Sequence, residues 1–199
     1  MSSPAAPLEA RAPKRARGHA RVEAILDAAA VVFAEKGFDA ATMTEIAARS
    51  ATAIGSLYRF FPTKTSLADA LLARYAEIVA EGFAAIEARA AAMTSEMLAD
   101  ALIERMLDTR PDSAAAVALV DLRPDGPNRR AAIRQAAREG IAAALRRRAP
   151  CAEGLDEAAA ALLQMLKGAR PLADAGAGPL AALRTAIRLY VAHVVGEDA

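Results

Sequence analysis

Hydroxyl and cationic side chains recur at short intervals in one stretch of the chain. They are Thr42, Thr44, Ser56, Tyr58, Arg59 and Lys64. Hydroxyls, ammonium groups, guanidinium groups and helix N-termini all donate hydrogen bonds to phosphate oxygens. This spacing indicates a surface that binds a polyanion rather than one that breaks or forms covalent bonds.

Residues typical of enzyme or metal sites are dispersed. The two histidines, His19 and His193, lie at opposite ends of the chain, and Cys151 has no histidine near it in sequence. No metal-ligand spacing and no phosphate-binding glycine loop is present. We therefore expect no catalytic residues, no metal and no cofactor, with an enzyme that uses carboxylates alone as an alternative.

The composition favours helices and an unequal distribution of charge. Hydrophobic residues make up 55% of the 199 residues, aromatic residues only 4%, and alanine is abundant, which favours helix. Residues 1–67 carry nine Lys and Arg against six Asp and Glu, whereas the remainder is slightly acidic. A single cysteine excludes an internal disulfide, and no long apolar run or leader-like segment occurs, so we expect a cytoplasmic protein without a membrane partner.

The polyanion-binding residues fall on three predicted helices. Apolar residues at helical spacing predict a first helix from His19 that closes at Gly37. Thr42 with Glu45 forms a capping-box pattern that opens a short helix over 42–50, and a third helix covers 53–60 until Pro62 stops it. Thr63 is expected to cap a long fourth helix. Three short helices with a tight turn before the last are typical of a helix-turn-helix that reads the DNA major groove.

Further helices fill the remaining chain. Turn and cap residues predict starts at Thr94, Ala114, Asn128, Leu155 and Gly178. No alternating β-branched run competes, so the predicted fold class is all-α.

The motif resembles the N-terminal signature of the TetR family of transcriptional regulators. The resemblance rests on Gly37-Phe38, Thr42-Met43, Ile46-Ala47, the run from Gly55 to Pro62, Lys64 and Leu67, and it covers roughly residues 20–67. It implies DNA-contacting roles for Ser56, Tyr58 and Lys64. The residues themselves add small side chains at Gly55 and Ser56, possible thymine-methyl contacts from Ala53 and Ile54, and polar base or phosphate contacts from Thr44 and Arg59.

Two stretches depart from the family pattern. Ser50-Ala51-Thr52-Ala53 stands where the family usually has Ala-Gly-Val-Ser, so a turn glycine and a capping hydroxyl are missing, with Thr52 as an alternative cap. Phe60, still counted among the DNA-binding positions, replaces a more usual His or Tyr.

The resemblance also implies an effector pocket among the middle helices and a dimer formed by the last two. An apolar small-molecule pocket is predicted from Phe83, Ile86, Met93, Met97, Leu102 and Met106. A homodimer interface is predicted from Leu162, Leu166, Leu183, Ile187, Tyr190 and Val194. The alternatives are that the methionine stripe is plain core and that the last stripe packs within its own chain.

The sequence thus predicts a flexible basic arm over 1–18, a helix-turn-helix domain over 19–66 and a helical effector-binding and dimerisation domain over 67–199. The resemblance implies a repressor that releases its double-stranded DNA operator when a small molecule binds. The alternative is a helical scaffold or enzyme that has lost DNA binding.

Overall fold

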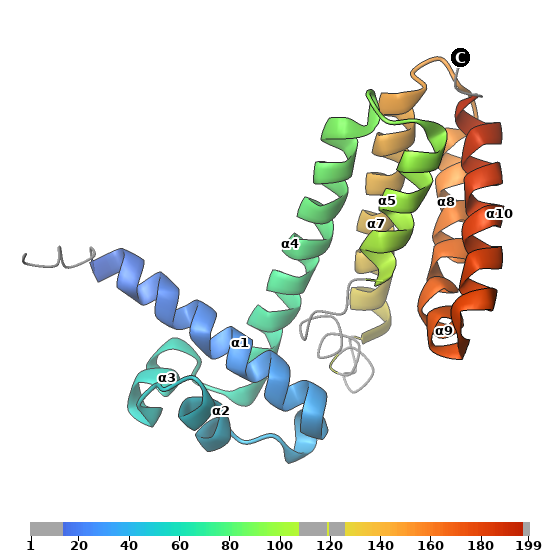
Figure 1. Cartoon of the computed structure of the whole chain (residues 1–199). Coiled ribbons are helices and arrows are strands. Elements are labelled where there is room, and N and C mark those ends of the chain that lie inside the picture. Colours follow the sequence, from blue (N-terminus) through green and yellow to red (C-terminus); the bar gives the residue numbers. More distant parts are fainter. Residues whose placement is uncertain (1–13, 108–118, 120–125, 197–199) are drawn as a thin grey trace, which may run out of the picture.

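The computed structural model describes residues 14–107, 119 and 126–196, and every regular element in these residues is a helix. The all-α prediction is confirmed. A small N-terminal group of helices, α1 to α3, lies at one end of the long helix α4, and a bundle of longer helices packs along the rest of α4 (Figure 1).

Helices α2 to α4 begin at the predicted local signals, whereas α1 begins before the predicted His19 and continues past Gly37. The four helices are α1 (Lys14–Ala40), α2 (Met43–Arg49), α3 (Ile54–Phe60) and α4 (Lys64–Ala90). Gly37 interrupts α1 with a φ of 76°, a left-handed conformation that suits glycine. Thr42 and Thr63 both form capping boxes, as predicted for Thr42. Helix α1 begins at Lys14, so residues 14–18 of the predicted flexible arm are helical, and residues 1–13 lie outside the described residues.

The remaining helices form the bundle. They are α5 (Ser95–Leu107), α7 (Gly126–Arg148), α8 (Leu155–Lys167), α9 (Ala169–Ala175) and α10 (Ala177–Val195). The amide of Met97 donates to the Thr94 hydroxyl, which confirms the predicted start of α5. The helix expected from Asn128 begins earlier, at Gly126, and the short α9 was not predicted. The helix expected over 114–122 lies outside the described residues except for Leu119, which is helical and buried.

Two hydrophobic cores share α4. Leu67, Leu71 and Leu72 belong to the N-terminal core, whereas Phe83 and Ile86 belong to the core of the bundle. Tyr75 packs against both cores. The two cores thus meet along α4, one continuous helix, and the predicted division between residues 66 and 67 stays a prediction.

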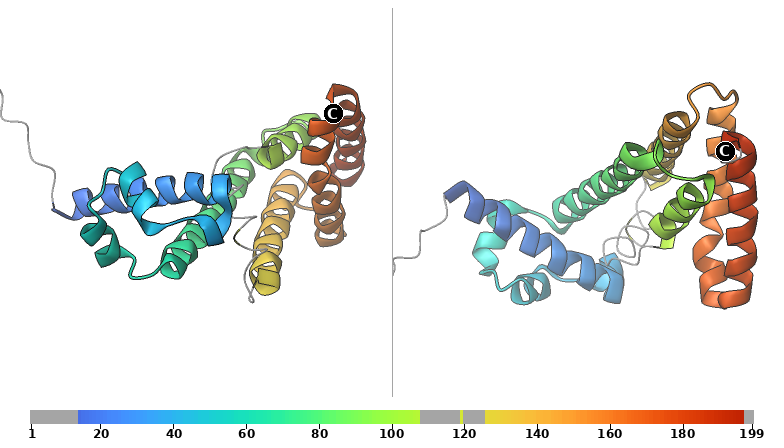
Figure 2. Two further views of the ribbon diagram at one scale, coloured as in Figure 1. Left: turned by 90° about the horizontal axis from the view of Figure 1, so that it is seen from below. Right: turned by 45° about the horizontal axis from the view of Figure 1, so that its top comes forward.

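The bundle packs closely where α4 meets α7. A Cβ placed on Gly140 would lie 2.4 Å from the Cβ of Phe83, so only a glycine permits this approach without a shift. The α8–α10 pair lies at the end of the molecule far from α1 to α3, as Figures 1 and 2 show.

Candidate nucleic-acid interface

The turn between α2 and α3 forms without the residues expected for it. Ala51 takes the left-handed conformation, with a φ of 48°, at the position where the family usually has glycine. Thr52 does not cap α3, which corrects the alternative drawn from the sequence. Its side chain is buried, and its hydroxyl donates to the Ser50 carbonyl oxygen at 3.2 Å. Ala53 is the N-cap residue, and no side chain caps α3.

Helix α3 has one buried face and one exposed face. Leu57 is fully buried and anchors the helix to the N-terminal core. The exposed side carries Ala53, Ile54, Gly55, Tyr58 and Arg59, with Ile54 41% and Tyr58 47% exposed. Ile54 and Tyr58, like Gly55 and Arg59, are one turn apart, so these residues form a single face. Large apolar and aromatic groups left in solvent mark this face for binding.

Ser56 and Phe60 lie at the margins of that face. Both are partly buried, and Phe60 packs against the N-terminal core. The predicted DNA-binding position at Phe60 is therefore directed largely toward the protein, because an aromatic ring gains more from apolar contact than from water.

At the start of α2, Thr42 serves the helix itself. Its hydroxyl accepts from the Glu45 amide at 3.2 Å and lies 3.0 Å from Glu45 Oε2, to which it donates. Lys36 and then Thr42, through hydrogen bonds, hold the pKa of the Glu45 carboxyl below its usual range. The Thr42 hydroxyl is thus used by the cap of α2, whereas the Thr44 side chain, two residues further along the chain, is exposed.

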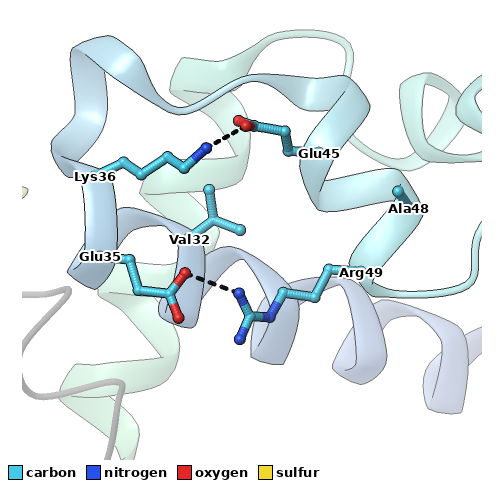
Figure 3. Close-up of a pocket in the computed structure, with 6 residues that line it drawn as sticks. All are labelled: Val32, Glu35, Lys36, Glu45, Ala48 and Arg49. Carbon is cyan, nitrogen blue, oxygen red and sulfur yellow. Dashed lines mark hydrogen bonds and ion pairs between the residues drawn. The ribbon is translucent and has the colours of Figure 1, made fainter.

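Two ion pairs that sequence reasoning missed hold α2 against α1. Lys36 pairs with Glu45, and Glu35 pairs with Arg49 at 2.8 Å. They bracket a surface hollow of about 440 Å³ with Val32 and Ala48 in its wall (Figure 3). Residues of opposite charge on two helices that are predicted to be neighbours would have indicated these ion pairs from the sequence.

Lys64, for which the resemblance implied a DNA contact, bonds to the end of α1 and the residue after it. Its ammonium group donates to the carbonyl oxygens of Phe38, Asp39 and Ala41 at 2.6, 3.0 and 3.0 Å. A lysine has three N–H donors, and three backbone acceptors surround them here. In this structure Lys64 therefore contacts the protein's own backbone.

The predicted pocket residues divide into three groups. Phe83, Ile86 and Leu102 are buried in the core of the bundle, and Met93 and Met106 pack against it while partly exposed. Met97 is 54% exposed and lies outside that core. That the five residues in or against the core line an apolar pocket stays a prediction.

The predicted interface residues are mostly interior. Leu162, Leu166 and Ile187 are fully buried within their own chain, and Leu183, Tyr190 and Val194 are partly buried against the same core. The outward face of α10 instead carries Ala182, Ala186, Leu189 and His193, with Leu189 68% exposed. Helical periodicity applied to the face of α10 opposite Ile187 would have identified these four exposed residues from the sequence.

Neither a metal-binding cluster nor a membrane-spanning helix is found among the described residues. These residues hold no group of three or more His, Cys, Asp or Glu side chains suited to a metal ion. Within the same residues, no helix is both long enough and apolar enough to span a membrane.

Comparisons with known proteins agree with this geometry. Residues 25–71 match the family model described as bacterial regulatory proteins, tetR family. A region of 66 residues is 41% identical to the HTH-type transcriptional repressor KstR2 of Rhodococcus jostii, covering 29% of this chain and 32% of that repressor. The chain thus matches about a third of the length of this relative.

Solved structures extend the likeness to the whole fold. A putative transcriptional regulator from Saccharomonospora viridis, in complex with choline, superposes with a TM-score of 0.65 at 19% identity, covering 91% of this chain and all of that one. A TetR family member from Streptomyces coelicolor A3 gives 0.64 at 24% identity, covering 88% and 98%.

The fold and the exposed α3 face define a helix-turn-helix protein with a second, all-helical domain. Its N-terminal domain, over residues 25–71, matches the model of the tetR family of bacterial regulatory proteins.

Proposed function

We propose that this chain is a transcriptional repressor that binds a double-stranded DNA operator through α3. The exposed α3 face carries the proposal, because a short helix with a dry inner side and a solvent-facing outer side is what enters a major groove. Ala53 and Ile54 would contact thymine methyl groups, and Arg59 and Thr44 would supply the polar contacts. Ser56 and Tyr58 would donate to phosphates, and Gly55 would let the backbone approach the DNA.

The repressor is proposed to respond to a small apolar effector in the bundle. The related S. viridis regulator was solved with choline, which shows that this fold accommodates a small molecule. Phe83 and Ile86 lie on α4, the helix that also supplies Leu67 and Leu71 to the N-terminal core. A ligand that shifts α4 would therefore reach the DNA-binding helices, provided that it binds the two states unequally.

The repressor is further proposed to act in the cytoplasm as a homodimer through α8 and α10. The outward face of α10, with Ala182, Ala186, Leu189 and His193, leaves apolar surface in water. Small side chains let a second copy approach closely, and a two-fold dimer presents two α3 helices to two half-sites.

A footprint and gel-shift titration of the DNA beside the chain's own gene tests the proposal. Specific retention of one fragment, with affinity that falls steeply and linearly in log–log form as salt rises, is expected for a repressor that contacts phosphates. Arg59→Ala is the matched variant, because its side chain is exposed on α3. Failure to retain any fragment at low salt would instead favour the alternative, a helical scaffold or enzyme without DNA binding.

A further inference from the structure

The Lys64 ammonium group joins two elements that are distant in sequence. Lys64 is the first residue of α4, and its three carbonyl partners, at Phe38, Asp39 and Ala41, lie between Gly37 and the Thr42 cap of α2. Phe38 and Asp39 belong to the last turn of α1, and Ala41 lies in the link from α1 to α2. The contact therefore ties the start of α4 to the start of α2.

Two aromatic rings, those of Phe38 and Phe33, stabilise the same contact. The Lys64 Nζ atom lies 4.6 Å from the centroid of the Phe38 ring, a cation–π distance. The Phe38 ring lies 5.7 Å from the ring of Phe33, which is fully buried. The ammonium group is thus held between backbone acceptors and a ring anchored in the N-terminal core.

The partial charges at the start of α4 and at the end of α1 explain why the Lys64 side chain extends from the first helix end to the second. A cation in the first turn of a helix opposes the positive end of the helix dipole. The last carbonyl oxygens of a helix lack intrahelical partners and attract cations. By reaching from the start of α4 to the end of α1, Lys64 moves its charge to the favourable site.

We propose that Lys64 is a positioning residue that couples α4 to the helix-turn-helix. Because α2 begins directly after Ala41, a displacement of the first turn of α4 moves the α1–α2 link and then α2. A short turn, residues 50–53, passes this movement to α3. The inference rests on the proposed function, since its consequence is measured as operator binding.

The competing role is a direct phosphate contact. In that role the ammonium group must leave three acceptors and release counterions from DNA, which contributes about one unit to the slope of log K against log salt. A positioning residue changes the affinity and leaves this slope unchanged. The salt dependence therefore separates the two roles.

Lys64→Met is the central variant, because methionine keeps an unbranched chain of similar length without the charge. We expect operator binding about tenfold weaker than wild type at one salt concentration, since hydrogen bonds from a charged group are lost, with the slope unchanged. The matched control Arg59→Met should lower the slope by about one. A Lys64→Met slope that falls by the same amount, or an affinity equal to wild type, overturns the proposal.

Phe38→Leu provides a second route to the same contact. It removes the ring beneath the ammonium group but leaves the charge, so positioning predicts weaker binding with the wild-type slope. A phosphate role predicts binding at least as tight as wild type. Circular dichroism establishes that each variant is folded at the temperature of the titration.

Hydrogen exchange tests the contact without DNA. In Lys64→Met, amides of residues 38–46 should exchange severalfold faster than in wild type, while peptides from α8 and α10 keep their rates. Arg59→Met should leave all of these rates unchanged. Unchanged exchange over 38–46 in Lys64→Met overturns the proposal, whereas absence of DNA binding by the wild type would refute only the proposed function.

Discussion

Asp100 of α5 accepts hydrogen bonds from Nε and Nη2 of Arg188 on α10, with Nε 3.0 Å from Oδ1. Arg184, one turn earlier on α10, donates to the same carboxylate at 2.9 Å. These bonds, that of Arg188 first, hold the pKa of Asp100 below its usual range. One partly buried carboxylate thereby connects two helices through partners 84 and 88 residues away in sequence.

The first prediction concerns acid stability. A carboxyl whose pKa is lower in the folded state stabilises the fold above its unfolded pKa, and this contribution is lost as pH falls through the folded pKa. Asp100→Asn should lower the free energy of unfolding by about 1–2 kcal/mol at pH 7. The gap from wild type should narrow below about pH 4, where the carboxyl of the unfolded chain is protonated.

Urea unfolding at several pH values measures this difference. Asp156→Asn is the matched control, because its pair with Arg146 is largely exposed and should matter little. A constant difference between Asp100→Asn and wild type from pH 7 to pH 3 would contradict the assignment.

The second prediction concerns the turn before α3. An alanine in the left-handed conformation is strained by about 1 kcal/mol relative to glycine, so Ala51→Gly should raise the unfolding free energy by up to that amount. Ala48→Gly, at an exposed position inside α2, should lower it by roughly 0.5–1 kcal/mol. Equal shifts for the two variants would show that Ala51 is not strained.

The third prediction concerns the contact of α4 with α7. Gly140→Ala places a methyl group against Phe83 and should cost about 1–3 kcal/mol of unfolding free energy, the usual cost of overpacking. Gly18→Ala is the control, because a Cβ there meets nothing within 4 Å. Thermal unfolding should show a lower midpoint for Gly140→Ala than for wild type and no decrease for Gly18→Ala. Equal midpoints for the two variants would contradict the close packing.

The fourth prediction concerns base reading. If Ile54 and Ala53 contact thymine methyl groups, uracil in place of thymine should weaken operator binding at one or more half-site positions. The same replacement in flanking DNA is the control and should have no effect. Equal affinity at every substituted half-site position would remove these contacts from the proposed interface.

The fifth prediction concerns the dimer. Leu189→Asp should weaken self-association by about 30-fold or more, because it places a charge at the centre of the proposed contact. Ala88→Asp, on the exposed side of α4, is the control. Sedimentation that finds the same dimer in both variants would place the interface elsewhere. Ile187→Asp is unsuitable as a test, because Ile187 is fully buried and the variant would destabilise the protomer.

Local patterns in the sequence were sufficient for the helices and for the α3 face. Thr42 with Glu45, Gly37 and Pro62 act within a few residues, so their effects do not depend on distant packing. The helical spacing of Ile54, Tyr58 and Leu57 likewise identifies an inner and an outer side. These features were predictable because their physics is contained in single turns.

Tertiary structure alone decided the partners of side chains whose environment is formed by distant segments. Lys64 resembled a phosphate ligand until the end of α1, more than 20 residues away, was seen to surround its ammonium group. Ile187 and Leu189 are both apolar residues of one helix, and only packing against α5 and α8 buries the first and leaves the second in solvent. Helical periodicity defines which residues share a face, but the free energy of burial depends on which other helices cover that face.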